Sequence, residues 1–359
     1  MRRRTFLAGF SSATVGLSGC SVPLQTGSER TLWTHEVDGS VSARPLVHGG
    51  SVFVGSHDNY MYGLDRHDGD ERWRFPAGAK VIGGAALAHG ALFWGSFDFR
   101  VYGVDVPRLE TGTPRVRWLF ETGSAISGTP VVDSSVLYIG SQDRSLYALD
   151  VDDGSLVWEF ETGGAVVSTP LSHGDSIYVG SNDNRLYAVD KSDGAERWRF
   201  EASDTVASEP AVFDRSILVG SYDGHLYSLA AADGELEWEF EAEGDIQSSP
   251  TVVGDTVYIG DRAGNVYAVD ARSGERVWTA ETGGVIYNSS PVVSDGTVYV
   301  GASARSGVYA IDADTGDSRW QFDTEGSVHD SVTVADGTLY FGTRRSGSTP
   351  GTVYALSVE

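Results

Sequence analysis

Cysteine and methionine are almost missing from this sequence of 359 residues, which contains one cysteine and two methionines. A single cysteine excludes an internal disulfide framework and a zinc site built on cysteines. No stretch approaches the run of about eighteen apolar residues that a membrane-spanning helix needs. Because 40% of the residues are hydrophobic and 11% are aromatic, the composition also excludes an intrinsically disordered chain.

Positive charge is scarce as well, since 26 Lys and Arg stand against 50 Asp and Glu. Three of the arginines lie in residues 1–19, which contain no acid, so the rest of the chain carries 23 basic and 50 acidic groups. Proteins that bind nucleic acids neutralise phosphates with Lys and Arg. We therefore expect no nucleic-acid partner.

The first twenty residues have the pattern of an export signal: a basic start, a short apolar stretch and a small-residue processing site. Within them, Arg3-Arg4-Thr5-Phe6-Leu7 resembles the twin-arginine export motif, and Leu17-Ser18-Gly19-Cys20 resembles a lipobox. We therefore expect a twin-arginine signal peptide over residues 1–20, a lipid on Cys20 and a flexible tether over residues 21–30. The alternative is an ordinary signal peptide with an incidental cysteine.

Together these motifs predict a protein that is exported by the twin-arginine route and anchored by lipid to the extracellular side of the cell membrane. The anchor makes the membrane surface one expected partner. We expect the folded part of the chain to be a monomer.

Tryptophan recurs along the chain at intervals of 40 to 45 residues. Each interval contains the same series of short β-branched and aromatic runs, separated by turn residues. Four such runs in about forty residues indicate one blade of a β-propeller. The phased tryptophans are Trp33, Trp73, Trp118, Trp158, Trp198, Trp238, Trp278 and Trp320.

The two ends of the repeat complement each other. Residues 321–359 repeat the pattern but stop before a tryptophan of their own, whereas residues 31–34 match only the last strand of a unit. Pairing the N-terminal strand with the last blade closes the ring and removes exposed sheet edges. The sequence therefore predicts an all-β fold, an eight-bladed β-propeller that spans residues 31–359.

The segment from Ala188 to Trp198 resembles the tryptophan-docking motif of propeller repeats of the pyrroloquinoline quinone (PQQ) type, the quinoprotein-like family. It recurs at residues 148–158, 268–278 and 310–320. The resemblance implies that each tryptophan packs between neighbouring blades. Size, blade count and predicted anchor are also similar to those of the propeller lipoproteins of the bacterial outer-membrane β-barrel assembly machine. That likeness implies a non-catalytic scaffold for an unidentified protein partner.

The same resemblance includes PQQ-dependent dehydrogenases, so an enzyme is the alternative. The resemblance implies that such an enzyme has long insertions, a vicinal cysteine pair and Glu, Asn and Asp ligands for calcium, whereas this chain has no cysteine pair and nearly minimal blades. Its eight histidines lack metal-ligand spacing, and no nucleophile elbow or phosphate-binding loop occurs. We therefore expect no catalytic residues, no metal and no cofactor; PQQ with calcium belongs to the alternative only.

Five predicted hairpins carry the sequence Gly-Ser-x-Asp, which places five carboxylates at equivalent positions. A ring of acids could bind cations, and a propeller that binds a small ligand or cation without turnover is a further alternative. The favoured interpretation is that each aspartate caps its own turn by accepting backbone N–H groups. The aspartates are Asp58, Asp98, Asp143, Asp183 and Asp223.

The repeat fails in the seventh, eighth and first predicted blades, which are neighbours in the closed ring. Small residues precede most inner strands, but polar and charged ones stand in these three blades, and two hairpins there carry arginine in place of Gly-Ser-x-Asp. An arginine cluster on an acidic protein suits an acidic partner or an anion, unless it only balances neighbouring acids. The candidate binding face consists of Arg44, Asn288, Arg305, His329, Asp330, Arg344 and Arg345.

The charge imbalance predicts that folding depends on salt. All but two of the basic residues are Arg, the exceptions being Lys80 and Lys191, and this composition resembles that of haloarchaeal proteins. At molar salt the Debye length falls to about 3 Å, so the self-repulsion of the acidic chain is screened. We expect cooperative melting, followed by circular dichroism, to disappear as potassium chloride is lowered from about 3 M to about 0.1 M. A melting temperature that does not change over this range would contradict the prediction.

Overall fold

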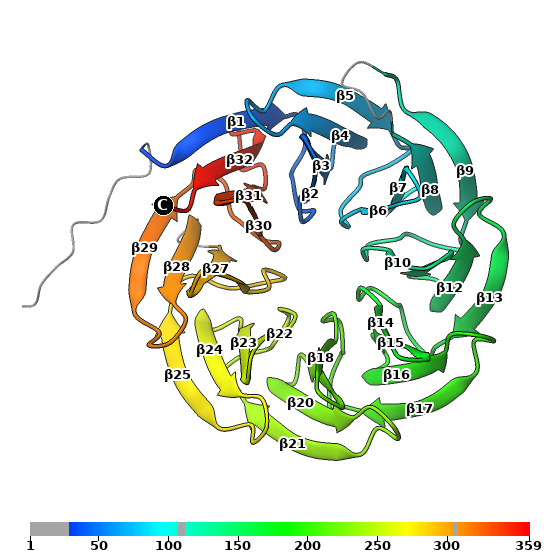
Figure 1. Ribbon diagram of the computed structural model, residues 1–359, viewed down its shortest axis with the longest axis vertical. Coiled ribbons are helices and arrows are strands. Elements are labelled where there is room, and N and C mark those ends of the chain that lie inside the picture. Colours follow the sequence, from blue (N-terminus) through cyan, green and yellow to red (C-terminus); the bar gives the residue numbers. More distant parts are fainter. Residues whose placement is uncertain (1–28, 107–111, 304–306) are drawn as a thin grey trace, which may run out of the picture.

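The computed structural model describes residues 29–106, 112–303 and 307–359. The predicted signal peptide, Cys20, most of the predicted tether and Arg305 lie outside the described residues. In the described part, 32 strands form eight antiparallel sheets of four strands each, and no helix there is long and apolar enough to cross a membrane. The sheets stand like blades around a central axis (Figure 1), which confirms the predicted eight-bladed β-propeller.

Seven blades take their strands consecutively from the chain, with the innermost strand first. Blades 1 to 4 consist of β2 (Leu46–His48), β3 (Ser51–Gly55), β4 (Tyr60–Asp65), β5 (Glu71–Pro76); β6 (Ala86–Ala88), β7 (Ala91–Gly95), β8 (Arg100–Asp105), β9 (Arg115–Glu121); β10 (Val131–Asp133), β11 (Val136–Gly140), β12 (Ser145–Asp150), β13 (Leu156–Glu161); and β14 (Leu171–His173), β15 (Ser176–Ser181), β16 (Arg185–Asp190), β17 (Glu196–Glu201).

Blades 5 to 8 complete the ring, and the last of them combines both ends of the chain. They consist of β18 (Ala211–Phe213), β19 (Ser216–Gly220), β20 (His225–Ala230), β21 (Leu236–Glu241); β22 (Thr251–Val253), β23 (Thr256–Gly260), β24 (Asn265–Asp270), β25 (Arg276–Glu281); β26 (Val292–Ser294), β27 (Thr297–Ala302), β28 (Gly307–Asp312), β29 (Ser318–Asp323); and β30 (Thr333–Ala335), β31 (Thr338–Gly342), β32 (Gly351–Ser357), β1 (Thr31–Val37).

The position of each strand in its blade explains its sequence pattern. In blade 4, β15 and β16 are buried almost throughout because neighbouring blades cover both faces of the sheet. The outer strand β17 alternates instead, with Trp198 buried between exposed neighbours. The inner strands begin after the phased proline, not just before it as the sequence suggested, because proline has no N–H to donate to a sheet.

Blade 8 closes the ring with the N-terminal strand, as predicted. Strand β1 pairs antiparallel with β32, and Trp33 lies opposite Ala355. Arg30 strengthens this closure, since its Nη1 donates to the carbonyl oxygen of Glu359 at 2.6 Å and its guanidinium lies 4.6 Å from the ring centre of Trp320. A cation over an indole face is a favourable contact, so Arg30 covers the outer-strand tryptophan of blade 7.

The core consists of eight apolar layers, one at each interface between neighbouring blades. The phased tryptophans lie in these layers. Trp158 of blade 3 is 7% exposed, and its Nε1 donates to the carbonyl oxygen of Lys191 in blade 4 at 2.9 Å. Gly194 packs on the indole at a φ of 74°, and an added Cβ would lie 2.8 Å from the ring. The same indole bond occurs at Trp33, Trp118, Trp198, Trp238 and Trp278.

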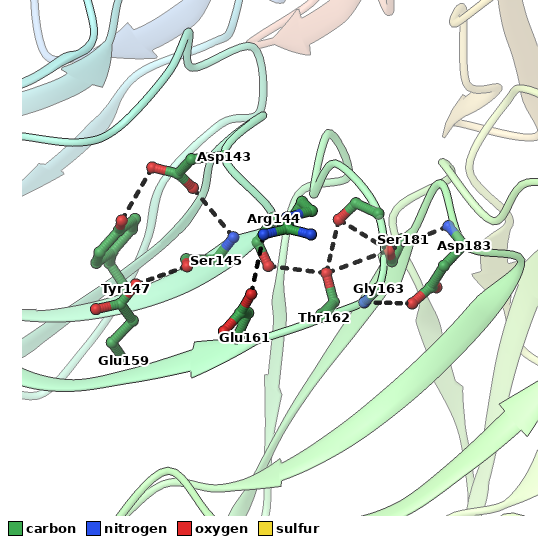
Figure 2. Close-up of polar contacts among 11 residues, drawn as sticks. Asp143, Arg144, Ser145, Tyr147, Glu159, Glu161, Thr162, Gly163, Ser181 and Asp183 are labelled. Atoms are coloured by element: carbon green, nitrogen blue, oxygen red, sulfur yellow. Dashed lines mark hydrogen bonds and ion pairs between the residues drawn. The ribbon is translucent and has the colours of Figure 1, made fainter.

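The hairpin aspartates join the blades on one face of the ring, here called the hairpin face because it carries the turn between the second and third strands of every blade. Oδ1 of Asp143 accepts the N–H of Ser145 at 3.0 Å, and its Oδ2 accepts the hydroxyl of Tyr147 at 2.9 Å. Asp183 also reaches back to the N–H of Gly163, at 2.6 Å, in the segment that leaves the preceding blade (Figure 2). Asp143 therefore caps its own hairpin as predicted, whereas Oδ1 of Asp183 accepts no hydrogen bond from the described residues and Asp183 joins two blades through its Oδ2 instead.

Blade 6 lacks the Gly-Ser-x-Asp motif, but an aspartate at another position of the hairpin forms equivalent hydrogen bonds. Asp261 occupies the position of the serine in Gly-Ser-x-Asp and is fully buried. Its Oδ1 accepts the N–H of Asn265 at 2.8 Å, and its Oδ2 accepts the hydroxyl of Tyr267 at 2.9 Å and the N–H of Gly244 at 3.1 Å. The function of the hairpin carboxylate is thus retained where its motif is lost.

Replacing a docking tryptophan tests this account of the interfaces. Trp198 is 8% exposed and bonds to Ala231 of the next blade, so Trp198→Ala should lower the free energy of unfolding by about 3–5 kcal/mol. Val157, on an outer strand and 48% exposed, gives a control, Val157→Ala, with an expected change within about 0.5 kcal/mol. Urea unfolding in molar potassium chloride measures both; equal losses would contradict the docking role.

Candidate functional site

The inner ends of the eight blades enclose a cavity of about 200 Å³ on the axis of the ring. All eight blades contribute to its wall, mainly with glycine, serine, threonine and alanine from the residues that precede the inner strands. Tyr222 and Arg344, which belong to turns on the hairpin face, also line it, so the cavity extends toward that face.

A ladder of hydroxyl groups joins the inner segments around this wall. The ladder is formed by the residue before the phased proline or its equivalent. The side-chain hydroxyl of this residue accepts a hydrogen bond from the backbone N–H of the corresponding residue in the preceding blade. These bonds satisfy backbone N–H groups that the short inner strands leave unpaired. The donor–acceptor pairs are Gly84–Thr129, Thr129–Thr169, Glu209–Ser249, Ser249–Ser290 and Ser290–Ser331. Arg44 and Glu209 occupy two of these positions with charged side chains.

The structure brings five of the seven residues of the predicted binding face to one place. The five residues that line the central cavity together are Arg44, Asn288, His329, Asp330 and Arg344.

Arg345 is separate from this group. Its side chain is exposed on the hairpin face; its N–H donates to Oγ of Ser40 at 3.0 Å, and its Nη1 donates to the carbonyl oxygen of Asp38 at 3.0 Å. Arg305 lies outside the described residues.

Asp330 stands where blades 4 to 6 have a serine. In blade 4, Oγ of Ser168 donates to the carbonyl oxygen of Gly180 at 2.9 Å and accepts its N–H at 3.0 Å. A carboxyl group can donate in this way only when it is protonated. Burial raises the pKa of Asp330 to about 7, although the hydrogen bond from Ser331 and the charges of the nearby arginines favour the ionised form.

Two histidines beside Arg344 are held neutral. Burial, and to a smaller extent the charge of Arg344, lowers the pKa of His57 and of His329 to about 4. The ring of His329 stacks on Tyr287, with ring centres 4.6 Å apart and planes at 9°. The guanidinium of Arg262 lies over the same tyrosine, 5.4 Å from the ring centre of Tyr287.

Sequence reasoning missed three residues of this region. Glu209 and Tyr222 line the cavity from blade 5. Tyr287 lies in the segment before the inner strand of blade 7, which is one residue longer than the corresponding segments of the other blades. Counting four blades on from Arg44 would have marked Glu209 as the charge across the ring. Tyr287 could have been found from the one-residue offset in the repeat of blade 7.

The residues around the channel do not fit quinone held by calcium. Within the described ranges, no group of three or more His, Cys, Asp or Glu side chains is placed to hold a metal ion. The cavity of about 200 Å³ is smaller than the roughly 300–1,000 Å³ usual for small-molecule pockets. The cavity therefore offers neither the calcium ligands nor the space that a bound tricyclic quinone needs.

Comparison with known proteins gives one family and several similar structures. The model of the family described as outer membrane protein assembly factor BamB matches residues 12–106, 99–211, 188–321 and 262–359. No curated protein sequence matches the chain.

Three solved structures illustrate the likeness. BamB from Moraxella catarrhalis superposes with a TM-score of 0.77 at 19% identity, covering 91% of this chain and 99% of that chain. The computationally designed Ika8 protein gives 0.77 at 15% identity, with 92% and 100% covered. Quinohemoprotein alcohol dehydrogenase ADHIIG from Pseudomonas putida HK5 gives 0.75 at 14% identity, with 93% and 78% covered. At these identities the likeness shows the fold alone.

The raised pKa of Asp330 predicts how stability depends on pH. A folded pKa of about 7, against about 3.9 when unfolded, means that the carboxyl favours folding below pH 4 and loses that contribution as the pH rises to 7. Asp330→Asn cannot ionise, so wild type should lose stability relative to this variant between pH 4 and 7.

The matched control is Asp175→Asn, on an exposed side chain. The free energy of unfolding of the three proteins is measured at constant salt across the range. Because the neutral His57 and His329 act in all three, their opposite pH dependence cancels in the comparison. A difference between wild type and Asp330→Asn that stays constant from pH 4 to 7 would contradict the assignment.

Proposed function

The chain belongs to the family described as outer membrane protein assembly factor BamB, and from this premise we propose that it is a non-catalytic scaffold that binds a protein partner through one face of its propeller. We place it on the extracellular side of the cell membrane, exported by the twin-arginine route and held by a lipid on Cys20. The sequence of residues 1–20 supports the export route and the anchor.

One observation carries the scaffold role: in the described ranges, short connections join the strands and no further element is added to the blades. In blade 4 the connections between successive strands are two, three and five residues long. Walls that enclose a substrate are usually made by long loops on a rigid scaffold. Rims of tight turns leave a broad, preformed surface, which suits recognition of another protein without large rearrangement.

The exposed hairpin of blade 8 is the part of this surface that differs most from the other blades. Eight residues separate β31 from β32, and Ser346 and Thr349 exchange backbone hydrogen bonds of 3.2 and 2.9 Å, so the hairpin is internally ordered. Its arginine, Arg345, donates to a backbone carbonyl. Corresponding hairpin arginines instead form ion pairs with carboxylates, Arg144 with Glu161 at 3.1 Å and Arg185 with Glu201 at 2.8 Å.

This difference makes Arg345 a charge available to a partner. Molar salt screens long-range charge effects, so Arg345 acts through direct guanidinium–carboxylate contacts with an acidic protein, which the surrounding acidic surface does not offer. We therefore propose an acidic surface of another membrane-associated protein as the partner of the hairpin face. The role of Arg44, Asn288, His329, Asp330 and Arg344 in this proposal is to form the channel mouth beside the hairpin.

Quinone-dependent oxidation is the second candidate, because the quinohemoprotein alcohol dehydrogenase shares the fold. The small cavity and the lack of a calcium-ligand group among the described residues argue against it. Saturable binding of PQQ and calcium, measured by titration calorimetry, would favour this candidate over the scaffold.

Charge reversal at the hairpin tests the scaffold role. Arg345→Glu should reduce recovery of the crosslinked partner from native membranes in molar salt at least about tenfold, because it removes direct guanidinium–carboxylate hydrogen bonds, which are too short to be screened by salt. Arg144→Glu, on the corresponding turn of blade 3, is the matched control and should recover the partner normally. Cys20→Ser should release the protein from the membrane fraction. Unchanged recovery with Arg345→Glu would overturn the proposed surface, and a membrane-bound Cys20→Ser variant would overturn the anchor.

A further inference from the structure

Two opposite charges face each other across the central channel. Arg44 in blade 1 and Glu209 in blade 5 occupy the same position of the repeat, directly before Pro45 and Pro210. Three blades lie between them in either direction, so their inner strands β2 and β18 lie on opposite sides of the ring (Figure 1). A residue before proline is held in an extended backbone, which fixes where each side chain starts.

Neither charge is neutralised by direct contact. Within the described residues, the guanidinium of Arg44 and the carboxylate of Glu209 form no ion pair and no side-chain hydrogen bond, although both line the central cavity. Both also line a second cavity of about 270 Å³ beyond the hydroxyl ladder. Burial raises the pKa of Glu209, and the charge of Arg44 opposes that rise from a distance. Arg44 is exposed, so the cost of an unpaired charge falls on the largely buried carboxyl group of Glu209, and a ligand cation beside that group would offset the cost.

The remaining ionisable groups of the cavity give its two walls opposite character. Arg44 and Arg344 stand on the side of blades 8 and 1, where Asp330 is partly protonated near neutral pH. Glu209 stands on the side of blade 5 together with the ring of Tyr222. His329 is neutral in this range, because its pKa is lowered to about 4. One wall is therefore positive, and the other is negative and aromatic.

We propose that the central channel binds a small zwitterion with one carboxylate and one ammonium group, such as an α-amino acid or a betaine. The carboxylate lies against Arg44 and Arg344, since guanidinium groups bind carboxylates through two parallel hydrogen bonds. The ammonium lies against Glu209 and the face of Tyr222, a combination that recognises primary and quaternary ammonium groups. A cavity of about 200 Å³ suits a molecule of this size.

The pairing of charges also defines what should bind weakly. An anion alone satisfies the arginines but leaves Glu209 unpaired, and a cation alone leaves Arg44 unpaired. The wall polarity thus selects for molecules that carry both groups. This inference does not depend on the proposed protein partner, because Arg345, the residue assigned to that partner, does not line the central cavity.

Titration calorimetry of the salt-stabilised protein tests the proposal. The probes are glycine, L-alanine, γ-aminobutyrate and glycine betaine, with acetate and tetramethylammonium as singly charged controls. At least one zwitterion should bind saturably and at least about tenfold more tightly than either control, because each control forfeits one charge-assisted contact. Glu209→Gln and Arg44→Gln should each weaken that binding at least about tenfold.

Matched variants keep the test independent of folding. Neutralising Glu209 removes an unpaired charge from a largely buried position, so Glu209→Gln should melt at or above the wild-type temperature, whereas Arg44 is exposed and Arg44→Gln should melt like wild type. Glu281→Gln and Arg144→Gln, at exposed side chains outside the cavity, should bind like wild type.

Three results would overturn the zwitterion site: no saturable binding of any zwitterion, equal affinity for acetate, or binding by Glu209→Gln that matches wild type. Partner recovery with Arg345→Glu reports on the scaffold role separately, so the failure of either proposal is distinguishable from the failure of the other.

Discussion

The fold depends on one indole ring at each blade interface. Trp158 shows the arrangement: its N–H bonds to the next blade, and a glycine without a Cβ lets that blade lie flat against the ring. The large apolar area of the indole and the directional bond fix both distance and angle between blades. Asp183 repeats the connection on the hairpin face, and hydroxyl groups such as that of Ser249 repeat it around the channel. The interface between blades 3 and 4 is thus held at the rim by Trp158, on the hairpin face by Asp183 and at the axis by the hydroxyl of Thr169.

This redundancy leaves two regions free to differ from the repeat, the hairpin face and the channel wall. The ladder around the axis uses backbone N–H donors, so a position such as Arg44 or Glu209 can change its side chain without breaking a strand. The hairpin of blade 8 can lengthen because β1 and β32 already close its sheet. Function in this propeller therefore resides where the repeat is broken, while the intact repeat positions those breaks.

Much of the fold follows from sequence, because spacing alone reports the interfaces. The tryptophan period predicted eight blades, and the incomplete last unit predicted closure by the N-terminal strand. Asp261 escaped the motif because its carboxylate reaches equivalent donors from two residues earlier in the turn. The contact between Arg30 and Trp320 could not be predicted from the sequence either, because it depends on how two distant parts of the chain meet. The opposition of Arg44 to Glu209 required the closed ring.

The proposed docking on the hairpin face is tested most directly by hydrogen–deuterium exchange of the chain in its native membrane, compared with the extracted, partner-free protein. The account predicts slower exchange of backbone amides in residues 343–350, with no change in the corresponding turn of blade 3, residues 141–145. Slower exchange confined to the opposite face, or identical exchange in both preparations, would contradict it.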